Sequence, residues 1–214
     1  MLGYVCKYTP MELFEAMDTE ITRLEPSVTD FNHADTLMHA NICSYTKAVL
    51  EDVMEHDYEG VILTTCCDSI RRLYDTLKSQ FPDKFFFLLD IPRKFNDFAV
   101  TLYERQLKQM LTEYEAFSGK TLDLKRFVSM MQNKAALKKQ ENTRMSASAV
   151  SEKGNGQKLN IGIMGARCNN EIRQLLVDRG ANLLFDLTCT GLARDFSITA
   201  VSYTHLTLPT KLEV

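Results

Sequence analysis

The sequence predicts the α/β class: doubly wound parallel sheets in two domains, with a helical segment between them. Short apolar stretches rich in β-branched or aromatic residues alternate with segments of helical periodicity, which is typical of parallel sheets covered by helices. A polar stretch over residues 140–158 separates two such series and predicts a linker. With 214 residues, 45% of them hydrophobic, the chain can bury a sizeable core. Domains of the Rossmann or flavodoxin type are therefore expected.

The first domain, residues 1–139, is expected to open with a short helix. The segment Thr9-Pro10-Met11-Glu12 fits a capping box with proline at the first helical position, and it predicts a helix to about Met17. Ile21 to Leu24 then has the pattern of a brief strand. The stretch from His33 to His56 is predicted to form one long helix.

The rest of the first domain alternates regularly between the two kinds of element. Residues 61–65 are apolar and largely β-branched, as in a buried parallel strand, and Asp68-Ser69 predicts the start of the following helix. Residues 85–91 predict the next buried strand. Two further helices are expected, over residues 96–117 and 122–139.

A second domain is expected over residues 159–200. Its first residues, Leu159 to Gly165, are strand-like, and the segment from Asn170 to Arg179 has helical periodicity. A strand from Leu183 to Leu187 completes one β-α-β unit. One such unit is too little to cover a sheet, so we expect this domain to be incomplete.

The end of the chain has an unusual pattern. Val201 to Thr210 match, residue for residue, one reading frame of a transposon adapter used in DNA sequencing libraries. Residues 201–214 are therefore predicted to be a non-native tail, and we expect the natural sequence to continue beyond Ala200.

Charge and hydropathy argue against several classes of protein. The 25 Lys and Arg residues are balanced by 28 Asp and Glu residues, without the basic stripe that a nucleic-acid partner requires. The longest apolar run, Phe85 to Leu89, is far shorter than the roughly 20 residues of a membrane helix. Met1 is followed by strand-like residues rather than a secretion signal, so we expect a cytoplasmic location. The six cysteines are then expected to be metal ligands, reactive thiols or small core residues rather than disulfides.

Five segments carry a resemblance to a known family. They are Gly3 to Leu13, Cys43-Ser44-Tyr45 running on to Leu50-Glu51-Asp52, Thr65 to Leu73, Phe117-Ser118-Gly119-Lys120 with Leu122, and Leu187-Thr188-Cys189-Thr190-Gly191. In this order the segments resemble the 2-hydroxyacyl-CoA dehydratase family, which includes dehydratase subunits, benzoyl-CoA reductase subunits and double-cubane cluster proteins.

The resemblance implies a lyase whose two related subunits, forming a heterodimer or a homodimer, each hold an iron–sulfur cluster of the [4Fe-4S] type. A separate ATP-dependent activator protein delivers one electron, and the acyl-CoA thioester becomes a ketyl radical that expels the hydroxyl group, a reversible syn elimination of water. Two alternatives stay open. One is a reductase subunit like those of benzoyl-CoA reductase or the double-cubane cluster proteins, and the other is a metal-free binding module with this fold.

Cys67 is the strongest candidate for an iron ligand. It lies where a predicted parallel strand ends and a helix begins, a position where open α/β sheets bind ligands and where a thiolate is stabilised. The resemblance implies a second ligand at Cys43. For the third ligand two alternatives stay open: Cys189 in the second domain, or a residue in the sequence expected beyond Ala200. Because the chain has no C-x-x-C run, we expect ligands from separate elements, with Cys43 and Cys67 facing one cavity.

The other cysteines receive different interpretations. Neighbouring side chains on a strand point to opposite faces, so Cys66 is predicted to lie in the core. Cys6 is expected to be structural, whereas Cys168, in a loop before a helix, could face a ligand or solvent. The sequence assigns no catalytic residue and does not identify the acyl group.

Overall fold

The computed structural model describes residues 1–28, 30–92, 94, 96–134, 159–165, 167–186 and 188. The chain divides into two units, Met1–Phe127 and Val128–Val214, each of which is described by itself. The predicted linker at residues 140–158 and the predicted tail at residues 201–214 lie outside the described residues. A domain boundary at these positions therefore stays a prediction.

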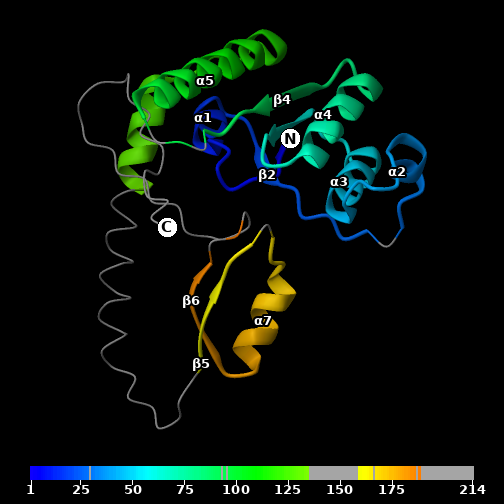
Figure 1. Cartoon of the computed structure of the whole chain (residues 1–214). Helices are drawn as coiled ribbons and strands as arrows, with labels where there is room; N and C mark the ends of the chain where they lie inside the picture. The colour runs from blue at the N-terminus through cyan, green and yellow to red at the C-terminus, as the bar shows by residue number, and fades with distance from the viewer. Residues whose placement is uncertain are drawn as a thin grey trace. The chain divides into compact units, whose positions relative to one another are not determined.

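The first unit is built on a parallel sheet, which confirms the predicted α/β class. Its described strands are β1 (Leu2–Tyr4), β2 (Ile21–Arg23), β3 (Gly60–Thr64) and β4 (Phe85–Leu89). They lie in the order β2-β1-β3-β4, and each neighbouring pair is parallel (Figure 1). Because β1 lies between β2 and β3, the chain leaves β1 and β3 in opposite directions along the sheet.

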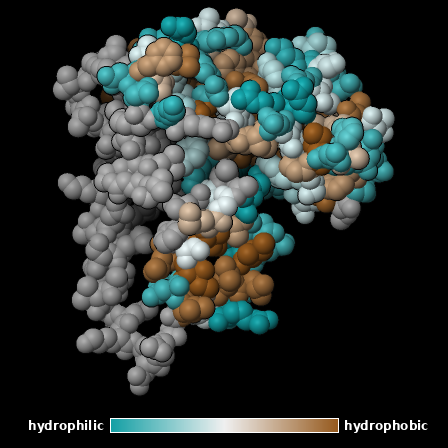
Figure 2. All heavy atoms as spheres, viewed as in Figure 1, coloured by the Kyte–Doolittle hydropathy of each residue, from teal (hydrophilic) through white to brown (hydrophobic). Residues whose placement is uncertain are grey.

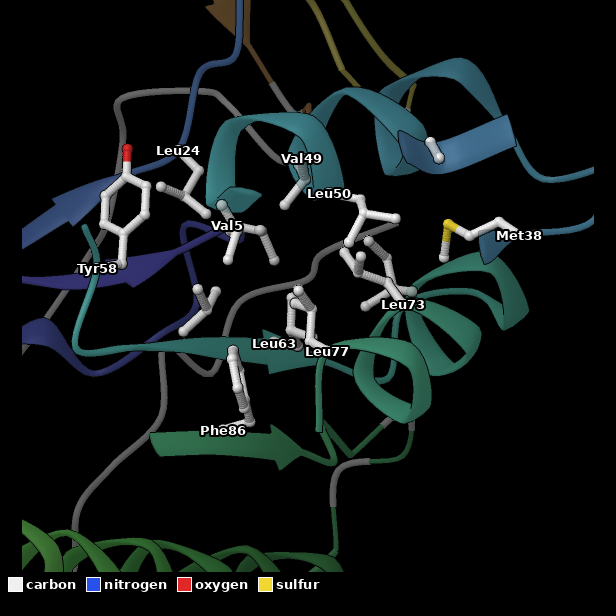
Figure 3. Close-up of a cluster of buried hydrophobic side chains, with 14 of the residues drawn as sticks. Val5, Leu24, Met38, Val49, Leu50, Tyr58, Leu63, Leu73, Leu77 and Phe86 are labelled. Carbon is white, nitrogen blue, oxygen red and sulfur yellow. The ribbon is translucent and has the colours of Figure 1, made fainter. Parts of the chain in front are cut away.

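Helices cover both faces of this sheet. α3 (Ser44–Glu55) and α4 (Asp68–Gln80) pack on one face, where their apolar side chains meet those of β3 (Figure 3). α1 (Met11–Ala16) and α5 (Asp97–Ser118) lie on the other face and are joined by Phe14 and Tyr114, whose rings meet edge to face. The core under α3 and α4 includes Val5, Leu24, Val49, Leu50, Leu63, Leu73, Leu77 and Phe86.

The sequence patterns of these elements follow from their surroundings. All five residues of β3 are buried, because helices cover both faces of the strand. Ile70, Leu73 and Leu77 recur at helical spacing on α4 and form its buried face. Gly119 ends α5 with a φ of +69°, a left-handed conformation that glycine adopts without a Cβ clash.

The prediction of one helix from His33 to His56 is wrong. Two helices occupy this stretch, α2 (Asn32–Leu37) and α3. Met38 leaves α2 in an extended conformation and is buried, and the Asn41 amide donates a hydrogen bond to His39 Nδ1. Such a local bond between side chain and backbone competes with helix formation. As a result, Cys43 precedes α3 instead of lying inside a helix.

The predicted capping box is also wrong. Pro10, rather than Thr9, is the N-cap of α1, because the Thr9 amide is held in a turn by a hydrogen bond to the carbonyl of Cys6. Glu12 then stands at the second helical position, one residue short of the spacing that a capping box needs.

Tyr114 joins α5 to the amino ends of the strands. Its hydroxyl donates to Glu59 Oε1 at 2.6 Å and lies 3.0 Å from Thr19 Oγ1. Its ring packs edge to face on Phe14 and on Phe85. Burial and the neighbouring Glu59 carboxylate raise the pKa of Tyr114 to about 12, so the hydroxyl remains a proton donor at neutral pH.

The second unit contains β5 (Leu159–Ile163), α7 (Asn170–Asp178) and β6 (Ala181–Asp186), with the two strands parallel. In the described part of this unit, the pair β5–β6 with α7 buries little apolar surface, and Figure 2 shows apolar residues gathered here. The exposed side chains include Leu159, Met164, Ile172, Leu175 and Leu184. Of the helices in the described part of the chain, none combines the length and the apolar character needed to cross a membrane.

Gly60→Ala should strongly destabilise the first unit. A Cβ at this position would lie 1.9 Å from the carbonyl oxygen of Phe85, its partner in the β3–β4 pair. The backbone must shift to relieve this clash, so we expect urea denaturation to show a loss of about 3 kcal/mol. Gly119→Ala is the control: a Cβ there meets nothing within 4 Å, and the left-handed backbone alone costs about 1 kcal/mol. Equal losses in the two variants would contradict the close approach of the strands.

Tyr114→Phe should lower the free energy of unfolding by about 2 kcal/mol, because the ring packing stays while a hydrogen bond to a carboxylate is lost. Urea denaturation measures the difference. Tyr74→Phe removes a hydroxyl that accepts only an exposed bond from Lys78, and it should change stability by less than about 0.5 kcal/mol. If Tyr114→Phe cost no more than Tyr74→Phe, the bond to Glu59 would not anchor α5.

Candidate functional site

The candidate site lies at the carboxyl ends of β1 and β3. The two strands pair in parallel, with Tyr4 opposite Ile62, so the residues that follow them come to the same edge of the sheet. The connections diverge at this edge, which is where open α/β sheets bind ligands. Cys6 follows β1, and Cys66 and Cys67 follow β3.

Cys67 and Cys43 occupy equivalent positions. Each is the N-cap of a helix, Cys67 of α4 and Cys43 of α3, and each has an extended backbone. Both residues are exposed. Because α3 and α4 pack against each other, the two thiols belong to the starts of neighbouring helices, whose free backbone amides stabilise negative charge.

The Cys43 thiol makes specific hydrogen bonds. Its sulfur lies 3.0 Å from the hydroxyl oxygen of Thr46, and it also bonds to Ser69 in the first turn of α4. Partial burial would raise the pKa of Cys43, but the bonds from Thr46, Ser69 and the Tyr45 backbone together lower it. The structure thus brings Cys43 to the helical turn that begins at Cys67.

The prediction that Cys66 lies in the core is wrong, because the residue is exposed. The alternation of side chains on which the prediction rested ends with β3 at Thr64, and the Cys66 amide turns back to donate to the Thr64 carbonyl at 2.7 Å. The sulfur itself is partly desolvated, which raises the pKa of Cys66, and nearby Cys67 and Cys6 raise it further.

The remaining cysteines differ in their surroundings. Cys6 is buried in the core cluster, in agreement with the expected structural role. Cys168, for which the sequence left two alternatives, is buried in the second unit. Cys189 lies outside the described residues. Among the residues that the structure describes, no three His, Cys, Asp or Glu side chains are grouped as a metal site.

Two buried charged residues near this edge escaped the sequence analysis. Lys7 and Glu12 are each only 5% exposed, and the Lys7 ammonium lies 5.4 Å from the centre of the Tyr8 ring. The signal that could have found Lys7 is its place just after the buried residues Val5 and Cys6, which follow β1. Burial of this kind is rare for charged residues and is often functional.

Glu51 was also missed as a positioning residue. One of its carboxylate oxygens accepts the Ala34 amide of α2 at 2.7 Å, and the other lies 2.7 Å from His33 Nδ1. The buried Glu51 side chain, which belongs to α3, therefore caps the first turn of α2. It links the two helices that lie before and after Cys43 in the chain. No local sequence pattern predicts this contact between Glu51 and α2.

A polar cluster lies at the carboxyl end of β6 in the second unit. Asp186 accepts hydrogen bonds from Arg173 Nε at 2.6 Å and from the amide and hydroxyl of Thr188. Burial would raise the pKa of Asp186, but the bonds from Thr188 and Arg173 outweigh it and lower the pKa. These bonds hold Thr188 at the end of β6.

Comparison with known proteins identifies the family. The model of the 2-hydroxyglutaryl-CoA dehydratase D-component family matches residues 6–151, more than half of the chain. A search of the curated proteins found no match. The matched segment begins at Cys6, just after β1, and contains β3, both helices of the site, and the thiols of Cys43, Cys66 and Cys67. The chain therefore belongs to the 2-hydroxyglutaryl-CoA dehydratase D-component family.

Proposed function

We propose that this chain is the iron–sulfur subunit of a 2-hydroxyacyl-CoA dehydratase that receives electrons from an ATP-dependent activator. Membership of the D-component family supports the reaction class. The observation that carries the iron–sulfur part is the pair Cys43 and Cys67, two exposed thiols at the starts of two helices that pack together. A related second subunit, an acyl-CoA substrate and a cytoplasmic location complete the proposal.

The residues present fit a cluster with thiolate ligands. Iron–sulfur clusters are held by cysteine thiolates, and hydrogen bonds favour the thiolate form of Cys43. Cys67 adds a second exposed sulfur at a helix N-terminus. Any further ligand comes from outside these two helices, and Cys189 is the candidate that the sequence offers.

The chain's own residues would position the ligands rather than react. Thr46 and Ser69 hold the Cys43 sulfur, and Glu51 fixes the helices that flank it. The buried side chain of Lys7 follows β1 at this edge of the sheet. When bound, the cluster would supply one-electron transfer to the thioester, which permits loss of the hydroxyl group as water; this chemistry belongs to the cofactor.

Cys43→Ser and Cys67→Ser should each remove most of the bound iron and abolish dehydration, because a hydroxyl replaces an iron-binding thiolate. Iron and sulfide analysis under anaerobic conditions, together with absorption spectra, measures the first effect. Activity on a 2-hydroxyacyl-CoA, with the second subunit and the activator present, measures the second.

Cys66→Ser and Cys168→Ser are the matched controls, and both should keep most of the iron. Full iron content in both Cys43→Ser and Cys67→Ser would refute the ligand assignment and favour a metal-free module. Iron binding without dehydration, but with electron transfer, would favour a reductase subunit of the same superfamily.

Thr46→Val should raise the pKa of the Cys43 thiol, because it removes a hydrogen bond that favours the thiolate. Iodoacetamide alkylates the thiolate of Cys43, and mass spectrometry of the peptide that contains Cys43 measures the rate at each pH. The pH at which this rate is half-maximal should be higher in the variant. Thr76→Val makes the same change on the exposed surface of α4, where the hydroxyl donates to a helix carbonyl, and should leave the profile unchanged. If Thr46→Val and the parent chain had the same pH dependence of alkylation, the Thr46 hydroxyl would not lower the pKa of Cys43.

A further inference from the structure

Cys66 is a thiol that the proposed function leaves unused. It directly precedes Cys67 in the turn between β3 and α4, and both residues are exposed. The Cys66 amide donates to the Thr64 carbonyl at 2.7 Å, so the two cysteines lie in a tight turn beyond the end of β3. An accessible thiol beside a potential resolving thiol is the arrangement found in redox-responsive proteins.

We infer that Cys66 and Cys67 form a redox modification site, a dithiol that closes reversibly to a disulfide when no iron occupies Cys67. The other thiols of the first unit are less suited to pair with Cys67. Cys6 is buried in the core, and Cys43 is held by Thr46 and Ser69.

A disulfide between the adjacent residues Cys66 and Cys67 is possible but strained. Consecutive Cα atoms are about 3.8 Å apart, below the usual span of about 4.4 to 6.8 Å in disulfides, so the bond would be strained and easily reduced. The turn lies beyond the last paired residue of β3, Thr64, so closure leaves the strand pairing with β4 intact. A labile, exposed disulfide is the kind that serves regulation rather than stability.

The oxidant in this proposal is a low-molecular-weight disulfide such as oxidised glutathione. One of the two thiolates attacks it, forms a mixed disulfide and releases one glutathione thiolate. The other thiolate then attacks the protein sulfur of the mixed disulfide and releases the second glutathione thiolate. The two protons from the cysteine thiols leave with the two reduced glutathione molecules, so atoms and electrons balance.

The consequence for iron rests on the proposed function. Once Cys67 is in a disulfide it is no longer a thiolate, so the oxidised chain would be unable to take up iron until the bond is reduced. Conversely, a bound cluster would protect the pair from oxidation.

The test uses the full chain, purified without iron and treated with oxidised glutathione before digestion with trypsin. Cleavage after Lys47 and Arg71 gives a peptide of residues 48–71 that holds Cys66 and Cys67 but no other cysteine. Mass spectrometry should show this peptide as a single species that has lost two hydrogen atoms, and dithiothreitol should restore them.

Cys66→Ser is the decisive variant, because it removes one partner of the pair from an exposed position. In this variant the same peptide should carry a stable mixed disulfide with glutathione at Cys67 instead of an internal bond. Cys168→Ser, a change in the other unit, should behave like the parent chain.

Three outcomes would overturn the inference. They are a peptide with both thiols still reduced, a peptide carrying glutathione in the parent chain without closure, and a disulfide that links residues 48–71 to the peptide of Cys6 or of Cys43. The mapping needs no iron, so it stands even if the iron analyses fail to support the proposed function. A second arm, with iron and sulfide loaded first, should show the peptide protected from oxidation.

Discussion

The arrangement of the candidate site depends on the apolar contact between β3 and the helices α3 and α4. Leu50 of α3, Leu63 of β3 and Leu73 of α4 are each fully buried in this contact. Burying each such side chain is worth roughly 1.5 to 3 kcal/mol, so the helices are held firmly on the sheet. Since Cys43 and Cys67 begin these helices, the same packing that stabilises the fold also sets where the thiols lie.

The two ends of the sheet have different chemistry. At the amino ends, the Tyr114 hydroxyl is hydrogen-bonded to Glu59 and to Thr19. The aromatic rings of Phe14 and Phe85 pack against Tyr114. At the carboxyl ends, thiols and helix N-termini occur together. This division is typical of parallel α/β folds, in which one edge supports the structure and the other carries function.

Much of this could be predicted from local patterns. β3 and β4 are continuous apolar runs, and the change from apolar strand to capped helix at Cys67 is visible in the sequence because both signals are local. The break between α2 and α3 was missed because it depends on the burial of the extended residue Met38 and on the bond from the Asn41 amide to His39, which apolar periodicity does not show. The exposure of Cys66 was missed because β3 ends two residues earlier, and a small error in a strand boundary reverses the expected direction of a side chain.

The hydrogen bond of Glu51 restricts the conformations that the backbone around Cys43 can adopt. Its hydrogen bond to the Ala34 amide closes a loop that contains the whole connection between α2 and α3. Closing the loop during folding removes conformational entropy from this connection before any ligand arrives. Cys43 is therefore preorganised. A ligand that binds its sulfur does not have to order the backbone, so less binding free energy is lost and the affinity is higher.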